Sequence, residues 1–193
     1  MGKIIAFYGI NNIGKTTQAL RIVDFLNNKG FKAFYVKYPV YDIEPSGPYI
    51  NSLLRSSAWQ NITEEEMQMW FTVNRFQYEP VLKKIMEEND FVILEDYVQT
   101  GIAWGSIKGA DKNWLEMINE PLIKEDLCIL LDGERDISAM EKGHIHEESD
   151  DLIGRCREFY LERAKEKGWK IVNVSEDWDV TTERILKIIK VII

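Results

Sequence analysis

The stretch Gly9-Ile10-Asn11-Asn12-Ile13-Gly14-Lys15-Thr16 fits the pattern G-x-x-x-x-G-K-[ST], and it decides the fold. An apolar run, Ile4–Tyr8, comes directly before it and predicts a buried strand. A helical pattern from Ala19 to Leu26 follows and ends at Lys29-Gly30. Strand, glycine loop and helix in this order form the setting in which the motif binds phosphate. The sequence therefore predicts a site for a nucleoside triphosphate.

The loop has the chemistry that a triphosphate requires. Its glycines let backbone N–H groups turn inward as a solvated anion nest, and the helix start adds partial positive charge. Lys15 is expected to reach the β- and γ-phosphates, and the Thr16 hydroxyl to hold Mg²⁺. An ordinary strand–helix turn is the weaker alternative, because strand, loop and helix agree. The predicted cofactors are ATP and Mg²⁺, and the predicted nucleotide-binding residues are Gly9, Asn11, Asn12, Ile13, Gly14, Lys15, Thr16 and Thr17.

The composition of the chain limits the classes of molecule that it can be expected to bind. The 193 residues can form one domain with a full core, and 45% apolar and 29% charged residues are ordinary for a globular protein. A net charge of −8 argues against a nucleic-acid polymer or an anionic membrane surface as partner. Two cysteines give no disulfide framework. No apolar segment approaches the roughly 20 residues that a membrane-spanning helix needs, and no secretion signal is evident. We expect a cytoplasmic protein that binds small nucleotides, with a homodimer left open.

The rest of the chain alternates apolar runs with helical patterns, which predicts a parallel sheet covered on both faces. We therefore expect one α/β domain spanning residues 1–193. In such a sheet, ligands bind beyond the carboxyl ends of the strands. The further strands are expected at Ala33–Val36, Phe91–Leu94, Leu127–Leu131 and Trp169–Val174.

The helices have local signals of their own. A loop is expected at Val40–Pro48, and Thr63 begins a capping box. Pro80 is expected to kink or break the helix that Thr63 starts, before Val81–Glu88 resumes it. A polar segment at 141–150 interrupts the alternation. Further helices are expected at about Tyr49–Ser56, Val98–Ser106, Lys112–Asn119, Asp151–Lys167 and Val180–Ile192.

Two acids end the strand predicted to lie beside the loop. Glu95 is the stronger candidate for anchoring Mg²⁺ directly or through water, because neighbouring strand residues such as Asp96 face opposite ways. Solvated acids at a strand end are the alternative. On the helix before that strand, Arg75 follows Phe71 by one turn on the same face, which favours a shared pocket over a solvated charge.

The order of these motifs resembles the thymidylate kinases, which pass a phosphoryl group from ATP to dTMP. The resemblance covers nearly the whole chain through the phosphate loop, Lys37-Tyr38-Pro39, Trp70–Arg75 and Glu95–Trp104. It implies a five-stranded parallel sheet, a lid near 141–150, and Lys15, Glu95 and Arg75 as catalytic residues. It also implies that Phe71 stacks on the base and that Arg75 holds the acceptor phosphate, with Trp104 as a second aromatic candidate. The acceptor-binding residues so implied are Asn11, Tyr38, Pro39, Tyr41, Phe71, Asn74, Arg75, Asp96, Tyr97 and Trp104, with Lys142 and His144 in the lid.

The chain also departs from the family pattern. Asn11 stands where the family has a carboxylate, and Tyr41 and Asp96 stand where it has arginines. The lid offers Lys142 as its cation. These departures leave two alternatives: a nucleotide-binding protein with weakened or lost transfer, and a kinase for another acceptor such as a nucleoside.

Other classes of site fit less well. His144 and His146 lack the further ligands that zinc needs. The Asn-Lys-x-Asp motif of a GTPase fails at Phe31, and the G-x-G-x-x-G motif of dinucleotide enzymes is missing.

Overall fold

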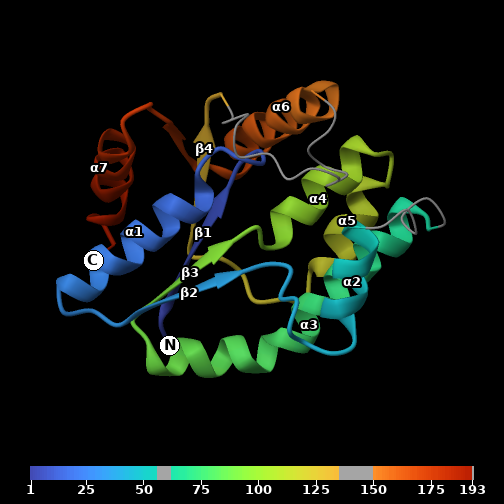
Figure 1. Ribbon diagram of the computed structural model, residues 1–193, viewed down its shortest axis with the longest axis horizontal. Coiled ribbons are helices and arrows are strands. Elements are labelled where there is room, and N and C mark those ends of the chain that lie inside the picture. Colours follow the sequence, from blue (N-terminus) through green and yellow to red (C-terminus); the bar gives the residue numbers. More distant parts are fainter. Residues whose placement is uncertain (56–61, 135–149, 193) are drawn as a thin grey trace.

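A computed structural model describes residues 1–55, 62–134 and 150–192 of the protein. Five parallel strands form one sheet in the order β2-β3-β1-β4-β5 (Figure 1), which confirms the predicted fold class. The strand β1 lies at the centre, and Phe7 pairs with Glu95 on one side and Ile129 on the other. The strands are β1 (Lys3–Tyr8), β2 (Ala33–Lys37), β3 (Phe91–Glu95), β4 (Leu127–Asp132) and β5 (Lys170–Asn173).

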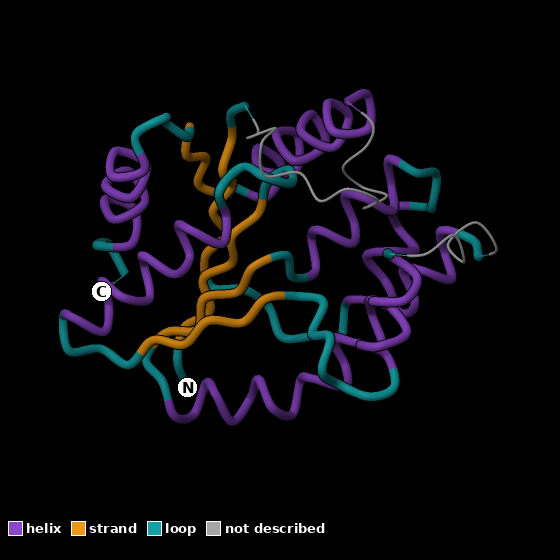
Figure 2. The backbone as a smooth tube through the Cα atoms, viewed as in Figure 1, coloured by secondary structure: helices purple, strands orange, loops and turns teal. Residues whose placement is uncertain are grey.

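Helices cover both faces of the sheet. Figure 2 shows the strands in the middle, with α1 and α7 on one side and α3, α4 and α6 on the other. The helix α2 packs on α3, and α5 packs on α4. The helices are α1 (Lys15–Asn28), α2 (Ser46–Leu54), α3 (Glu64–Glu88), α4 (Val98–Ile107), α5 (Lys112–Asn119), α6 (Asp150–Lys167) and α7 (Trp178–Ile189).

The core follows from the central strand. Every residue from Ile4 to Tyr8 is completely buried, as a run with helices on both sides requires. A second, smaller apolar cluster joins α2 to α3 through Ile50, Leu53, Leu54 and Met67. This cluster holds the two helices together beside the carboxyl ends of the strands, where the sequence places the acceptor site.

Pro80 was expected to kink or break a helix, and the predicted break is wrong. The helix α3 runs continuously from Glu64 to Glu88 with Pro80 inside it. Proline has no N–H to donate to the carbonyl of Phe76, but both residues lie on the exposed face, where water can satisfy that carbonyl. The cap is as predicted, since the Thr63 hydroxyl accepts a hydrogen bond from the backbone N–H of Glu66 at 3.1 Å.

Two helices differ from the sequence prediction by more than one residue. The helix α2 begins at Ser46, within the expected loop, and Pro48 fits there because the first turn of a helix needs no intrahelical N–H donors. The helix α7 spans Trp178–Ile189 rather than Val180–Ile192. No helix in the described part of the chain has the length and apolar character needed to cross a bilayer.

Candidate active site

The loop between β1 and α1 has the backbone that its glycines predict. Gly9 and Gly14 have φ angles of 146° and 93°, and Asn12 has 62°. At Gly9 a β-carbon would lie 2.7 Å from the carbonyl oxygen of Leu131, so β4 leaves no room for a side chain. The helix α1 begins at Lys15, and its first N–H groups face the loop. The loop can therefore receive an anion.

Lys15 is not solvated, as the sequence analysis expected, but only 5% exposed. Its ammonium group donates to the carbonyl oxygens of Gly9 and Ile10, both at 3.0 Å. It also lies 3.5 Å from a carboxylate oxygen of Asp96. The reason is that the loop folds over the side chain, so that two carbonyl oxygens of the loop accept hydrogen bonds from the ammonium. A nucleotide would have to draw this ammonium away from its present partners.

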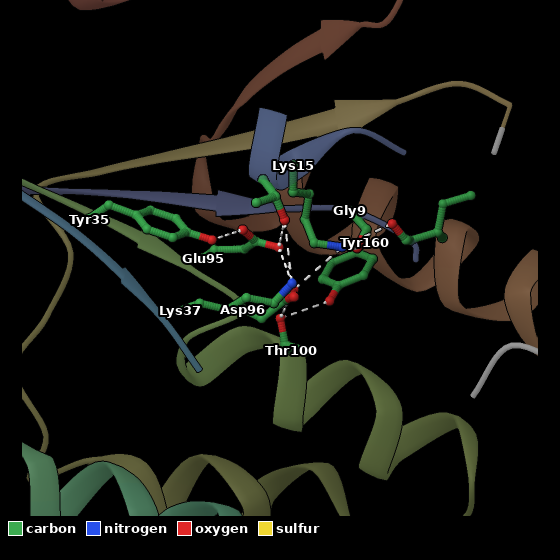
Figure 3. A network of polar contacts seen from close by, with 10 residues as sticks. Gly9, Lys15, Tyr35, Lys37, Glu95, Asp96, Thr100 and Tyr160 are labelled. Carbon is green, nitrogen blue, oxygen red and sulfur yellow. Dashed lines mark hydrogen bonds and ion pairs between the residues drawn. The ribbon is translucent and has the colours of Figure 1, made fainter. Parts of the chain in front are cut away.

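Glu95, at the end of β3, is the centre of a polar network (Figure 3). One of its oxygens accepts hydrogen bonds from the Thr16 hydroxyl at 2.9 Å and lies 3.0 Å from the ammonium of Lys37. The other accepts from the Tyr35 hydroxyl. Burial alone would raise the pKa of Glu95, but Lys15 and Lys37 outweigh burial and lower it. Glu95 is therefore held as a carboxylate.

Asp96 also faces this network, although adjacent residues in a strand point to opposite sides. It has left the strand, with φ at 58°, and this left-handed backbone turns its carboxylate toward Lys15. The Thr100 hydroxyl donates to Asp96 at 3.1 Å, and the Tyr160 hydroxyl donates to Thr100. Burial raises the pKa of Asp96, and the neighbouring Glu95 charge adds to that despite Lys15. Two acids therefore share the site.

The oxygens at this point suit Mg²⁺. The Thr16 hydroxyl and one Glu95 oxygen are adjacent. The Lys37 ammonium lies within 3.3 Å of both, in a position that a metal cation could take. No cluster of three or more acid, cysteine or histidine ligands occurs in the described ranges. Mg²⁺ does not need one, since it usually takes one or two protein oxygens together with substrate phosphates and water.

A cavity of about 500 Å³ extends from the phosphate loop to α3 and α4. Phe71 and Trp104 line its far end, and Lys37, Gln68, Thr100, Gly101 and Trp178 also contribute. Of the predicted residues, the cavity brings together Asn11, Asn12, Gly14, Lys15, Thr16, Thr17, Tyr38, Pro39, Tyr41, Phe71, Asn74, Arg75, Glu95, Asp96 and Trp104. Gly9 and Ile13 shape the loop without lining the cavity.

Arg75 is a buried cation at the far end of this cavity. It is 4% exposed, and its guanidinium donates to the Asn119 side-chain oxygen at 2.8 Å. Its Nε is buried without a hydrogen-bond partner, and no ion pair joins Arg75 to an acid within residues 1–55, 62–134 and 150–192. Burial lowers its pKa. A buried charge without a counterion is costly, so the site is prepared for an anion or a polar ligand.

Two predicted acceptor residues have structural tasks. The Asn74 amide accepts from the backbone N–H of Val40 and donates to its carbonyl, both at 2.8 Å, and also donates to Ser46. It thereby fixes the segment that carries Pro39 on the cavity wall. Tyr97 does not line the cavity but lies behind it, with its ring 4.9 Å from that of Tyr38.

Several cavity residues were missed from the sequence. The sequence pointed to Lys37 only as part of the stretch Lys37-Tyr38-Pro39, although its place at a strand end was a usable signal. Gln68 lies one and two turns before Thr72 and Arg75, on the same face of α3. Trp178 had no signal, because only the folded chain brings its ring against Gly14. The predicted lid residues Lys142 and His144 lie outside the described residues.

The chain is similar to known proteins over nearly its whole length. A family model described as thymidylate kinase matches residues 7–185. A probable thymidylate kinase 1 from Saccharolobus solfataricus is 31% identical over 193 residues, covering 98% of both chains. A thymidylate kinase from Arabidopsis thaliana is 24% identical, covering 97% of this chain and 71% of that one. A solved thymidylate kinase from Candida albicans superposes with a TM-score of 0.79 at 23% identity, covering 98% of this chain and 92% of that one.

Proposed function

This chain belongs to the thymidylate kinase family, and we propose from that premise that it transfers the γ-phosphoryl group of ATP to dTMP to give dTDP. The observation that carries the proposal is the placing of Arg75. Its buried guanidinium, which has no acid partner among the residues that the structure describes, opens on the same cavity as the phosphate loop. A cavity with a cation at each end suits two anionic ligands that must meet.

The donor end is proposed to act through Lys15, Thr16 and the N–H groups of the loop. Lys15 exchanges the carbonyls of Gly9 and Ile10 for the β- and γ-phosphates. Thr16 and Glu95 would hold Mg²⁺, which neutralises charge on the phosphates. Lys37, which now pairs with Glu95, would be able to interact with the transferring group from the same end of the cavity. The Asn11 amide lines the cavity and can hydrogen-bond a sugar hydroxyl.

The acceptor end is proposed to position dTMP between aromatic and polar walls. Phe71 and Trp104 line the cavity on α3 and α4, where a base can lie against them, and Tyr38 and Tyr41 come from the segment after β2. Arg75 attracts the acceptor, and Asn119 fixes its orientation. Phosphoryl transfer depends mostly on positioning and charge neutralisation, so these contacts can account for the chemistry.

Other features of the protein belong to the proposal. We propose a single kinase domain over residues 1–193, with the lid at about 141–150, and a cytoplasmic location.

A homodimer is proposed through α3, where Met69, Val73 and Phe76 are 48%, 40% and 39% exposed at helical spacing. Sedimentation equilibrium measures that assembly, and a monomer at all concentrations would contradict it.

The experiment follows ADP formation with ATP and Mg²⁺ in the presence of dTMP or thymidine. Wild type should prefer dTMP, and Arg75→Ala should lower kcat/KM for dTMP by about 10²-fold or more, as loss of a placed charge does. Arg163→Ala is the matched control, since Arg163 is also 4% exposed but pairs with Glu116 and lies outside this cavity. Faster transfer to thymidine, with Arg75→Ala nearly silent, would overturn the proposal.

A further inference from the structure

Tyr35 is a residue of the edge strand β2 that the mechanism above does not use. In the pairing of β2 with β3, Lys37 lies opposite Glu95 and Tyr35 lies opposite Ile93. Tyr35 and Lys37 are two residues apart on the same face of β2, so both can reach the Glu95 side chain. Figure 3 shows the Tyr35 ring with its hydroxyl directed at the Glu95 carboxylate.

The two oxygens of Glu95 have different partners. Oε1 accepts a hydrogen bond from the Thr16 hydroxyl and lies beside the Lys37 ammonium, at the place proposed for Mg²⁺. Oε2 accepts a hydrogen bond from the Tyr35 hydroxyl, which is its only donor among residues 1–55, 62–134 and 150–192. Glu95 is 2% exposed, so bulk water has little access to either oxygen. One oxygen therefore faces the metal site, and the protein occupies the other.

The hydroxyl of Tyr35 keeps its proton and remains a donor. Burial raises the pKa of Tyr35, and the charge of Glu95 raises it further. Glu95 is held as a carboxylate, because Lys15 and Lys37 outweigh the effect of burial on its pKa. A hydrogen bond from a phenol to an ionised carboxylate is stronger than one between neutral groups. The contact therefore fixes the orientation of the carboxylate.

This orientation suits one class of divalent cation. A carboxylate with one oxygen engaged offers a metal only the other oxygen. Mg²⁺ needs single oxygens in near-octahedral geometry and keeps several waters, so it accepts such a ligand. Ca²⁺ is larger, gathers about six to eight oxygens and often takes both oxygens of one carboxylate. The contact from Tyr35 denies Ca²⁺ the second oxygen of Glu95.

We propose that Tyr35 determines the metal selectivity of this site by keeping Glu95 a ligand through one oxygen, which favours Mg²⁺ over Ca²⁺. Tyr35 is a positioning residue, because it acts on the metal through Glu95 and does not touch the reacting groups. This inference rests on the proposed function, which assigns Mg²⁺ to Thr16 and Glu95. It follows that the loss of one hydroxyl group should change the choice of metal.

The test counts bound metal and needs neither an acceptor nor turnover, so its outcome is separate from that of the dTMP assay. Mn²⁺ is bound in the presence of adenylyl imidodiphosphate, an ATP analogue that is not hydrolysed, with the protein in excess. Mg²⁺ or Ca²⁺ then displaces Mn²⁺, and electron paramagnetic resonance follows the free Mn²⁺. Wild type should prefer Mg²⁺ over Ca²⁺ by about tenfold more than the free analogue does, and Tyr35→Phe should lose about that factor, as expected for a group that orients a metal ligand.

Two further variants show whether the effect acts through Glu95. Tyr8→Phe is the matched control, since the Tyr8 hydroxyl also donates to a glutamate, Glu125, but outside this cavity. It should keep the metal preference of wild type. In Glu95→Gln, the addition of Tyr35→Phe should change the preference by less than about twofold, because the carboxylate that Tyr35 orients has already been removed.

Each result supports or overturns the role of Tyr35. A wild-type preference no greater than that of the free analogue would overturn it, which keeps the proposal testable even where Tyr35→Phe fails to fold. An unchanged preference in Tyr35→Phe, or an equal loss in Tyr8→Phe, would also overturn it. An equal loss in the Glu95→Gln background would overturn the action through Glu95. If dTMP were not phosphorylated but the preference still depended on Tyr35, the proposed acceptor would fail and the metal selectivity would stand.

Discussion

The cationic side chains at the two ends of the cavity differ in whether they have a carboxylate partner. At the phosphate loop, Lys15 lies against Asp96 and Lys37 against Glu95, so each ammonium already has a carboxylate partner. At α3, the neutral Asn119 is the only hydrogen-bond partner that the described residues give the Arg75 guanidinium. The first end is neutralised from within, whereas the second carries an uncompensated charge below the surface.

This difference has a consequence for binding. A triphosphate at the loop must separate the lysine–carboxylate ion pairs before it contacts the lysines itself. Much of its interaction energy therefore replaces the energy of those ion pairs. An anion that reaches Arg75 displaces no acid and relieves a desolvated charge. We therefore expect the donor end to rearrange on binding and the acceptor end to be prepared in advance, which gives each end its own response to substitution.

The largest effect is expected at the donor end. Lys15→Ala should lower kcat by about 10²- to 10³-fold, because the charge that follows the phosphates is lost. Thymidine binding should change little, since Arg75 and Phe71 stay in place. Lys29→Ala, at the exposed end of α1, is the control for loss of a lysine. Initial rates of ADP formation and calorimetry measure the two quantities, and a rate within tenfold of wild type would remove Lys15 from the mechanism.

The donor end was also the easier one to predict from the sequence. A contiguous motif, Gly9–Thr16, specifies a backbone shape, and apolar runs such as Phe91–Leu94 specify the strands around it. The sequence could not reveal that Asp96 turns into the same site as Glu95, because one left-handed residue cancels the alternation of the strand. It also could not pair Lys37 with Glu95, because that contact depends on strand order.

The acceptor end is assembled from residues whose meaning depends on their neighbours. Arg75 could be proposed from its spacing to Phe71, but its burial without an acid follows only from the packing of α3 against α4 and α5. Gln68 resembles any polar residue of a helix until Gly101 and Gly105 are seen opposite it. The continuous α3 likewise depends on water reaching the exposed carbonyl beside Pro80. Helical spacing suggests such residues, and tertiary contacts decide among them.

An intermediate effect is expected for the metal. Glu95→Gln should weaken binding of Mn²⁺, used as a spectroscopic substitute for Mg²⁺, by about 10- to 100-fold in the presence of nucleotide, because the anionic oxygen beside Thr16 is lost. Asp132→Asn is the matched control, since Asp132 also ends a strand but pairs with Arg157 outside the cavity. Electron paramagnetic resonance counts free Mn²⁺ directly. Unchanged affinity in Glu95→Gln would show that the network of Figure 3 holds Lys37 rather than preparing a metal site.

The smallest effect is expected at Trp178, and it tests where the donor base lies. The acceptor end is lined by residues of α3 and α4, so we place the base of ATP where α7 contributes Trp178 to the cavity lining. There the Trp178 ring is 40% exposed, lines the cavity and lies against Gly14, where a β-carbon would be 2.4 Å from it.

Trp178→Leu should raise KM for ATP by roughly 2- to 10-fold, the value of an aromatic contact, and leave thymidine binding unchanged. Phe34→Leu, which alters another exposed aromatic ring away from the cavity, should change neither quantity. If Trp178→Leu instead weakened thymidine and spared ATP, the two ends of the cavity would have to be exchanged. The uncompensated Arg75 would then face the donor, and the comparison between the ends would be reversed.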